Sequence, residues 1–398
     1  MTNPLPRMED LEVADKRVLV RCDLNVPLKN GRITDDLRVR ASAPTLTALL
    51  GRGARLAVCS HLGRPQGKVV EELRLAPVGR RLEELLGTDV TVVDEVVGDR
   101  ATAACDSDAP VVLLENLRFD PGEEKNDPAF ADALAALADA YVNDAFGSSH
   151  RAHASVVGVP ERVPAAAGSL LADEVEKLER LLHDPARPFV AVLGGAKVSD
   201  KLGVITNLLV RVDAVVIGGA MAFTLLVAEG NEVGRSLVER DRVDEVKEVL
   251  ERARSLGVDV HLPTDVVAAD APEEGASHEV VLLDRIGDRL GVDIGPASAE
   301  QFGAIVREAK SVLWNGPMGI FEIDAFADGT RAVARAVADA TQAGAYTVVG
   351  GGDSAAALRQ LDMTDAVSHL STGGGASLEL LEGADLPGVA VLRERGGR

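Results

Sequence analysis

Short apolar runs alternate with longer amphipathic stretches along the whole chain. Several runs, such as Val111–Leu114 and Ala214–Ile217, contain valine, isoleucine and leucine without alternating polar residues. This pattern is typical of parallel strands that helices cover on both faces. Helical stretches such as Pro128–Ala140 and Val243–Leu256 lie between the runs, and strand–helix–strand repetition favours parallel sheets. The chain is therefore predicted to be an α/β protein with ligands beyond the carboxyl ends of its strands.

The predicted strands are spread over both halves of the chain. They are Val18–Cys22, Leu56–Ser60, Val90–Val93, Val111–Leu114, Ala140–Val142, Val190–Leu193, Ala214–Ile217, Val258–His261, Val312–Trp314, Thr347–Val349 and Val367–Leu370. A chain of 398 residues exceeds what one ordinary hydrophobic core supports. The periodic, charged stretch Leu170–His183 is predicted to be a helix that links two domains. We place these domains at 1–168 and 169–382, followed by a tail at 383–398 with a strand-like run, Val389–Leu392.

Composition excludes several classes of function. The net charge of −21 argues against non-specific nucleic-acid binding. No apolar stretch approaches the length of a membrane span and no signal-like segment opens the chain, so no membrane partner is expected. Cys22, Cys59 and Cys105 form no CxxC pair, which fits a reducing, cytoplasmic compartment.

Polar and cationic side chains follow the predicted strands of the first half. These residues are Asp23, Asn25, Arg38, His61, Arg64, Arg118 and Arg151. Arginine forks bind carboxylate and phosphate groups with two hydrogen bonds. Any single arginine is more often part of a surface ion pair, but four of them at equivalent places favour convergence. The first half is therefore predicted to bind a small anionic substrate.

Glycine-rich turns take the same place in the second half. Gly350–Gly352 and Gly373–Gly375 each follow an apolar run and open a predicted helix. Glycines there let backbone N–H groups crowd around an anion. Lys197 and Lys201 are four residues apart and are expected to share one face of a helix that begins after Gly195. The second half is therefore predicted to bind the phosphates of a nucleotide.

Two other phosphate-binding patterns do not fit. Gly350–Ala355 satisfies G-x-G-x-x-A, but no acidic residue follows in His369–Thr372, which argues against a nicotinamide dinucleotide. The G-x-x-x-x-G-K-[ST] motif of Walker-type enzymes does not occur. Asp353 is instead a candidate ligand of Mg²⁺ on a di- or triphosphate, with capping of the following helix as the alternative.

The motifs that carry these residues occur in one order along the chain. They are Arg21–Pro27 (R-x-D-x-N-x-P), His61–Pro65 (HLGRP), Glu115–Phe119 (ENLRF), Asp144–His153, Leu193–Lys201 (LGGAKVSDK), Trp314–Pro317 (WNGP), Gly350–Asp353 (GGGD) and Ser371–Gly375 (STGGG). With this set the chain resembles the phosphoglycerate kinase family over nearly its whole length. The resemblance implies two Rossmann-like domains with parallel-sheet cores, a hinge helix and a substrate cleft between them.

The resemblance also implies the reaction and its residues. A cytoplasmic monomer would transfer a phosphoryl group reversibly from 1,3-bisphosphoglycerate to MgADP, giving 3-phosphoglycerate and MgATP, with closure of the domains. The implied glycerate-binding residues are Asp23, Asn25, Arg38, His61, Arg64, Arg118 and Arg151. The implied nucleotide-binding residues are Gly195, Lys197, Lys201, Gly219, Gly291, Asn315, Glu322, Gly350, Gly351, Gly352, Asp353, Ser354, Gly373 and Gly374. Asp353 would hold Mg²⁺, Glu322 would meet the ribose, and the tail would pack on the first domain.

The family reaction explains why the sequence offers no nucleophile with a paired base. A carboxylate attacks in the ATP-consuming direction, and with a pKa of about 4 it is already ionised at neutral pH. Catalysis then depends on positioning and charge, for which Arg38, Lys197 and Lys201 are the candidates. The alternatives are another carboxylate kinase and a non-catalytic binding protein, and the second predicts loss of these cations.

Overall fold

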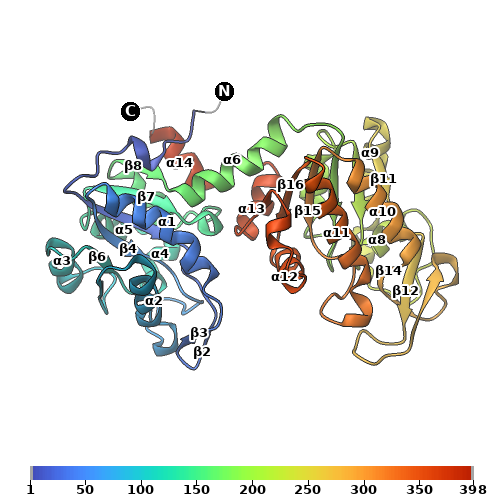
Figure 1. The fold of residues 1–398 in the computed structure, drawn as a ribbon, viewed down its shortest axis with the longest axis horizontal. Helices are drawn as coiled ribbons and strands as arrows, with labels where there is room; N and C mark the ends of the chain where they lie inside the picture. The colour runs from blue at the N-terminus through green and yellow to red at the C-terminus, as the bar shows by residue number, and fades with distance from the viewer. Residues whose placement is uncertain (1–2, 396–398) are drawn as a thin grey trace. The chain divides into compact units, whose positions relative to one another are not determined.

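The computed structural model describes residues 3–395, and these form two compact units (Figure 1). One unit comprises the chain up to Glu176 and again from Asp385, and the other spans Lys177–Ala384. The division falls inside helix α6 (Ser169–His183), the stretch predicted to link two domains. No helix within residues 3–395 is long and apolar enough to cross a membrane.

The first unit is built on a six-stranded parallel sheet. Its strand order is β5-β6-β4-β1-β7-β8, and every pairing is parallel. The strands are β1 (Arg17–Cys22), β4 (Arg55–Cys59), β5 (Val90–Val92), β6 (Val111–Leu113), β7 (Ala140–Asp144) and β8 (Ala165–Ala167). The predicted strands of the first half are therefore confirmed, whereas β8 was missed because a run of three alanines has no strand preference of its own.

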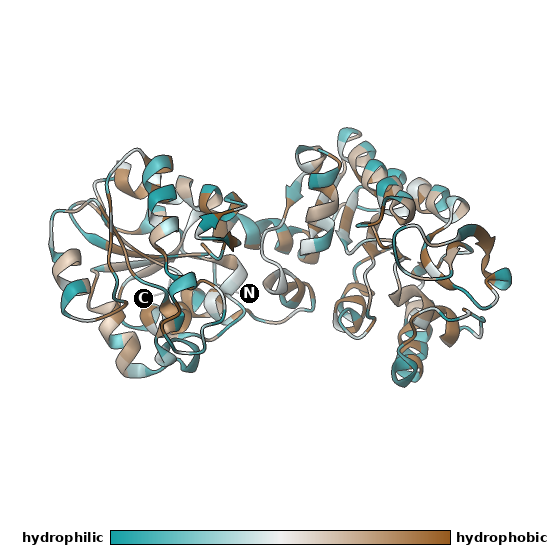
Figure 2. Ribbon diagram, turned by 90° about the horizontal axis from the view of Figure 1, so that it is seen from below, coloured by the Kyte–Doolittle hydropathy of each residue, from teal (hydrophilic) through white to brown (hydrophobic). Residues whose placement is uncertain are grey.

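Helices and a small hairpin complete the first unit. The helices are α1 (Leu37–Gly51), α2 (Ala76–Leu86), α3 (Asp99–Asp106), α4 (Pro121–Lys125), α5 (Pro128–Ala135) and α14 (Pro387–Arg395), and β2 (Leu28–Lys29) pairs with β3 (Arg32–Ile33). The helices carry both hydrophobic and hydrophilic residues (Figure 2), as expected when one face packs on a sheet. The start of α5 is set by its local sequence, because Pro128 occupies the first turn and the side chain of Asp127 accepts a hydrogen bond from Phe130 N.

The predicted strand at Val389–Leu392 is wrong, since these residues lie within α14. Pro387 opens this helix, and the arginines of its last turn suit a helix C-terminus. α14 packs against β8, and Gly388 N donates to Ser149 O at 2.9 Å. Of the predicted tail, residues 385–395 thus belong to the first unit, residues 383 and 384 belong to the second, and residues 396–398 fall outside the described residues.

The second unit has its own six-stranded parallel sheet, ordered β11-β10-β9-β15-β16-β17. The strands are β9 (Phe189–Leu193), β10 (Ala214–Ile217), β11 (Asp259–His261), β15 (Ser311–Asn315), β16 (Tyr346–Gly350) and β17 (His369–Leu370). All six were predicted. Chain order reverses between β9 and β15, and such a switch point forms a crevice at the carboxyl ends of the strands where ligands bind.

The rest of the second unit surrounds this sheet. Its helices are α7 (Leu202–Leu208), α8 (Met221–Ala228), α9 (Val243–Leu256), α10 (Pro296–Glu308), α11 (Asp328–Gln342), α12 (Gly352–Gln360) and α13 (Gly375–Leu381). An antiparallel sheet of β12 (Asp265–Ala269), β13 (His278–Leu282) and β14 (Leu290–Ile294) was not predicted. The α/β class and the two parallel sheets are confirmed, and both glycine turns do open helices, α12 and α13.

Candidate active site

Two residues after β1 hold a cation of helix α1, one through its side chain and one through its backbone carbonyl. Arg38 Nη1 donates to Asp23 Oδ1 at 3.1 Å and to Asn25 O at 3.2 Å. The side chain of Asn25 also accepts a hydrogen bond from Gly63 N at 2.9 Å, which joins this loop to the one after β4. Asp23 and Asn25, both predicted to contact substrate, therefore also position Arg38 within the first unit.

His61 lies at the end of β4 as a buried, neutral hydrogen-bond donor. Arg21 Nη2 lies 3.0 Å from His61 Nδ1. Because arginine only donates, Nδ1 must accept and the ring proton must sit on Nε2. Burial holds the pKa of His61 well below its usual range, and the charges of Arg21, Arg118, Arg38 and Arg151 act in the same direction. These arginines and His61 thus form one group, which we call the arginine group.

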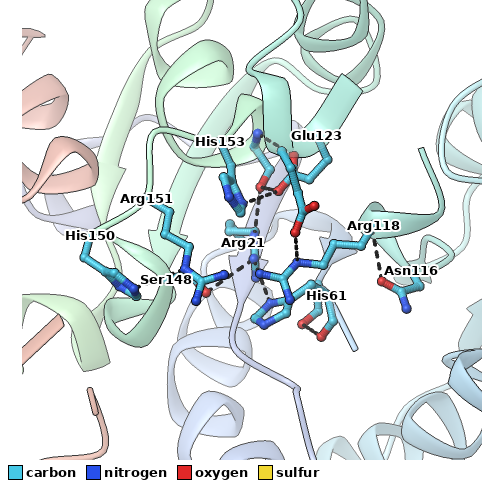
Figure 3. Close-up of polar contacts among 12 residues, drawn as sticks. Arg21, His61, Asn116, Arg118, Glu123, Ser148, His150, Arg151 and His153 are labelled. Carbon is cyan, nitrogen blue, oxygen red and sulfur yellow. Dashed lines mark hydrogen bonds and ion pairs between the residues drawn. The ribbon is translucent and has the colours of Figure 1, made fainter. Parts of the chain in front are cut away.

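Arg118 and Arg151 are the members of the arginine group that come from later loops (Figure 3). Arg118 is 5% exposed, and its Nη1 donates to Gly63 O at 2.7 Å. Arg151 Nε lies 3.1 Å from His150 Nε2. Arg64 directly follows Gly63 in the loop after β4, and its side chain is exposed. The structure therefore brings Arg38, His61, Arg118 and Arg151 together and leaves Arg64 on an adjoining loop.

A buried network behind these cations was missed by the sequence reasoning. Arg21 is fully buried, and its Nε donates to Ser155 Oγ at 2.9 Å. Ser155 in turn donates to both carboxylate oxygens of buried Glu123, from Oγ at 2.6 Å and from N at 2.9 Å. Burial alone would raise the pKa of Glu123, but hydrogen bonds with His153 and Ser155 and the charge of Arg21 outweigh it and lower that pKa. The sequence did contain a sign of this network, because an arginine inside an apolar strand, such as Arg21, needs a buried partner.

In the second unit, glycines let the turns after β9, β10 and β15 touch. A Cβ on Gly194 would lie 2.1 Å from Pro317 O. A Cβ on Gly219, whose φ is +67°, would lie 2.6 Å from the backbone of Gly195. Trp314 Nε1 donates to Gly316 O at 2.8 Å from within the core. The backbones of these three turns, which we call the phosphate turns, therefore pack directly against one another.

The turns after β9 and β15 and the glycines before α12 and α13 line a cavity of about 360 Å³ in the second unit. We call it the phosphate cavity. It is lined by Gly194, Gly195, Ala196, Lys197, Asp200, Lys201, Asn315, Gly316, Gly351, Gly352, Asp353, Ser354, Gly374, Gly375 and Leu378. Gly350 and Gly373, although predicted to bind nucleotide, do not line it: Gly350 ends β16, and Gly373 N donates to Ser371 Oγ.

Both lysines line the phosphate cavity, but the helix predicted to carry them is wrong. Residues 196–201 form a turn, and α7 begins only at Leu202. Glu239 accepts hydrogen bonds from Ser199 N and Oγ in this turn, which tie it to a residue 40 positions away. Lys201 Nζ donates to Asn315 Oδ1, and burial lowers its pKa to about 8 although Asp200 and Asp353 oppose the shift.

Helix α12 presents a free carboxylate and a bound hydroxyl. Asp353 is exposed, and its side chain makes no capping hydrogen bond to α12. Ser354 Oγ accepts a hydrogen bond from Gly316 N at 2.6 Å. Asn315 Nδ2 is buried and has no hydrogen-bond partner among the described residues. The phosphate cavity thus offers an unused amide donor, two lysines and the carboxylates of Asp200 and Asp353.

A second cavity of about 450 Å³ adjoins the phosphate cavity and shares Gly195, Ala196 and Asp353 with it. We call it the apolar cavity. Its other lining residues are Gly219, Ala220, Phe223, Leu237, Pro263, Val266, Pro272, Leu290, Gly291, Val292, Asp293, Ile294, Pro317, Met318, Gly319, Ile320 and Glu322. Gly219, Gly291 and Glu322, all predicted for the nucleotide, therefore lie here. An apolar cavity beside a phosphate cavity suits a nucleoside joined to phosphates.

Comparison with known proteins decides the family. The family model for phosphoglycerate kinase matches residues 8–384. The chain belongs to the phosphoglycerate kinase family. It is 54% identical over 391 residues to the phosphoglycerate kinase of Moorella thermoacetica, covering 98% of this chain and 99% of that one. The phosphoglycerate kinase of Thermomicrobium roseum is 55% identical over 390 residues, covering 97% and 99%.

Solved phosphoglycerate kinases have the same fold. The structure from Coxiella burnetii aligns with a TM-score of 0.90 at 42% identity, over 98% of this chain and 100% of that one. The structure from Pyrococcus horikoshii aligns with a TM-score of 0.85 at 32% identity, over 99% and 100%. As a member of the phosphoglycerate kinase family, the chain is a phosphotransferase with a carboxyl acceptor that acts on 3-phosphoglycerate and ATP in glycolysis.

Proposed function

We propose that the arginine group binds the glycerate substrate and that the two cavities of the second unit bind the nucleotide. The observation that carries the nucleotide assignment is the shared wall at Gly195, Ala196 and Asp353, because it makes the two cavities continuous. The glycerate side would use Asp23, Asn25, Arg38, His61, Arg64, Arg118 and Arg151. The nucleotide side would use Gly195, Lys197, Lys201, Gly219, Gly291, Asn315, Glu322, Gly351, Gly352, Asp353, Ser354 and Gly374, with Gly350 and Gly373 supporting the turns.

Asp353 is our candidate for the Mg²⁺ ligand. Its carboxylate is exposed, lines both cavities and is not occupied by helix capping. The described residues hold no cluster of three acidic, histidine or cysteine side chains that could bind a metal alone. The donor set therefore fits Mg²⁺ completed by phosphate oxygens and water, as this ion prefers. Mg²⁺ bound there would neutralise phosphate charge.

The chemistry needs charge stabilisation and no base. The attacking carboxylate is already ionised at neutral pH, so the protein has to hold it in line and stabilise the charge on the transferring group. We assign this to Arg38, Lys197 and Lys201. Arg38 is fixed by Asp23 and Asn25, and Lys201 is partly buried, where a charge acts more strongly than in water.

The two assigned sites lie on different units, so transfer requires them to approach. We propose that the chain bends about α6 when both substrates are bound, which would exclude water from the acyl phosphate. Small-angle scattering with 3-phosphoglycerate and a non-hydrolysable ATP analogue together should show compaction. An unchanged radius of gyration would contradict the bending. We further propose a cytoplasmic location, which the three free, buried cysteines support, and a monomer, whose mass light scattering would measure.

The proposed function is tested by following 1,3-bisphosphoglycerate formation from ATP and 3-phosphoglycerate, with and without Mg²⁺. Asp353→Asn should lower the rate by roughly 10²-fold at limiting Mg²⁺. Asp244→Asn is the matched control, because Asp244 is likewise the second residue of a helix and is exposed. Equal rates for Asp353→Asn and the wild type would show that Asp353 is not the Mg²⁺ ligand. If adding 3-phosphoglycerate causes no ATP consumption, the proposed reaction is wrong.

A further inference from the structure

A buried aspartate stands in the wall of the apolar cavity. Asp293 lies on β14 opposite Val267 of β12 and is 3% exposed. Its Oδ1 accepts a hydrogen bond from Ile294 N at 2.9 Å, and its Oδ2 accepts one from Gly329 N at 2.7 Å. Gly329 is the second residue of α11, whose own N-cap residue, Ala327, supplies no side-chain cap. Asp293 therefore caps a helix from another part of the chain.

Two glycines let the backbone press against this carboxylate. A Cβ on Gly319 would lie 2.3 Å from Asp293 Oδ1, and a Cβ on Gly329 would lie 2.4 Å from the same atom. Gly319 belongs to residues 317–322, which we call the wall loop. No side chain other than that of glycine fits at either place without moving the carboxylate.

The wall loop connects the parts of the nucleotide site. Ile320 N donates to Val292 O on β14, and Met318 N donates to Thr330 Oγ1 on α11. At its first residue the loop is joined to the turn after β9, because Pro317 O accepts a hydrogen bond from Gly195 N. The loop also carries Glu322, the residue assigned to the ribose. Asp293 thus sits where β14, the wall loop and α11 meet.

We propose that Asp293 is a positioning residue that sets nucleotide affinity by fixing the wall loop against β14 and α11. It acts through the backbone of the loop, which shapes one side of the apolar cavity. This inference rests on the proposed placement of the nucleotide. Its effect belongs to nucleotide binding, because Asp293 contacts none of the residues assigned to the transferring phosphoryl group.

The charge of Asp293 adds a pH dependence that the geometry explains. The pKa of Asp293 is raised to about 7, chiefly by burial and also by Asp328, while the two backbone N–H groups and Arg331 act in the opposite direction. Asp328 and Arg331 lie on α11, whereas β12 presents Val267 and the wall loop presents Gly319. Ionised Asp293 accepts both hydrogen bonds. A protonated carboxyl accepts them less strongly, so its hold on the start of α11 should weaken below about pH 7. Met318 N of the wall loop is bonded to Thr330 in the same turn of α11, so the loop should loosen with it.

A second aspartate of the same unit provides a matched control. Asp265 is also buried and accepts hydrogen bonds from Ala297 N and Ser298 N, which caps α10. Gly295 approaches its carboxylate as closely, with a hypothetical Cβ at 2.3 Å. Asp265 does not line the apolar cavity. Asp293 and Asp265 therefore share burial and helix capping and differ in contact with the nucleotide site.

The test compares Asp293→Asn with Asp265→Asn in the full-length chain. The KM for ADP and the kcat should be measured from about pH 5.5 to pH 8.5, together with the dissociation constant for ADP by calorimetry. At pH 8 we expect Asp293→Asn to raise the KM for ADP roughly tenfold and to change kcat less than about threefold. The ratio of mutant to wild-type KM should shrink toward pH 5.5, and the titration of ADP itself cancels in that ratio. Asp265→Asn should leave the KM for ADP within about twofold.

Gly319→Ala tests the same contact from the wall loop if Asp293→Asn does not fold. The added methyl group should displace the loop from Asp293 and raise the KM for ADP in the same way. An unchanged KM in whichever variant folds would overturn the proposal, and so would equal effects of Asp293→Asn and Asp265→Asn. If neither variant folds, Asp293 is structural and the proposal is also overturned.

Ala196→Leu separates this proposal from the proposed nucleotide site. Ala196 is exposed and lines both cavities, so a leucine there should block ADP without disturbing the core. If Ala196→Leu leaves ADP binding intact, the placement of the nucleotide is wrong. If Ala196→Leu blocks binding and Asp293→Asn does not weaken it, only the role of Asp293 is wrong.

Discussion

The arginine group of the first unit and the phosphate cavity of the second are both suited to bind anions, but they use different parts of the chain. The arginine group presents side-chain charges, which a buried network through Arg21 and Glu123 holds in place. The phosphate cavity presents backbone at Gly194, Gly195 and Gly316 beside its two lysines. A site made of side chains is lost when an atom is removed, whereas a site made of backbone is lost when an atom is added.

The largest effect should come from Arg38→Ala in the first unit. This change removes a cation assigned to the transferring group, which should lower kcat by roughly 10²–10³-fold while ADP affinity stays nearly intact. Arg40→Ala is the matched control, because Arg40 lies on the same helix and pairs with Asp36 on the surface. Rates and ADP binding should be measured together, and an equal loss of both would give Arg38 a structural role.

Gly352→Ala makes the opposite kind of change in the second unit. A Cβ there meets nothing within 4 Å, so the melting temperature should not fall. The methyl group would project where a phosphate is expected to lie, and we expect the dissociation constant for ADP to rise roughly tenfold or more. Gly51→Ala, at the end of α1, adds a methyl group in equally open space and should leave ADP binding unchanged. Unaltered ADP binding in Gly352→Ala would contradict the backbone cradle.

The charge of the phosphate cavity should depend on pH through Lys201. Its pKa is lowered to about 8 by burial, so the free protein loses this positive charge as pH rises through that value. ADP affinity, measured by calorimetry from about pH 7 to pH 9.5, should therefore fall roughly fivefold or more over that range. Lys201→Arg stays charged and should show a flatter profile. Parallel profiles for the two proteins would show that Lys201 does not cause the fall.

The smallest effect concerns stability in the first unit. Asp144 Oδ1 accepts hydrogen bonds from Leu170 N and Leu171 N at the start of α6, and burial raises its pKa to about 7. The folded state then binds more protons than the unfolded state between about pH 4 and pH 7, so this residue lowers the free energy of unfolding as pH rises through that window.

Asp144→Asn should remove this contribution, which is on the order of 1–2 kcal/mol between pH 5 and pH 7.5. Urea unfolding at both pH values measures it as a difference from the wild type. Asp99→Asn, at an exposed position in the first turn of α3, should show no such difference. The same pH slope in Asp144→Asn as in the wild type would contradict the assignment.

Most of the parallel sheets could be predicted because their strands are buried on both faces and form unbroken apolar runs. The antiparallel strand β13 (His278–Leu282) was missed although it ends in Val280, Val281 and Leu282, and it differs from the parallel strands in being largely exposed. The helix expected to carry Lys197 failed for a different reason. Its local spacing fits a helix, but the contacts of Ser199 with Glu239, which lies 40 residues away, hold that segment as a turn.

The functional site, like the fold, could be predicted from the sequence only in part. Motifs identified the residues at strand ends, because parallel strands place their carboxyl ends at one edge. Motifs did not reveal how Asn25 joins two loops through Gly63, or that Glu123 stabilises Arg21 from behind. Those contacts depend on side-chain directions and on partners far apart in the chain, which single-sequence patterns do not contain.

Trp314 gives this protein an optical probe at the right place. It is the single tryptophan of the chain, and its indole N–H is bonded to Gly316 O in the turn after β15. Indole emission responds to changes in its immediate surroundings, so ligand arriving in the phosphate cavity can be followed by intrinsic fluorescence without a dye, a label or an engineered reporter. Binding to the second unit can thus be timed separately from turnover.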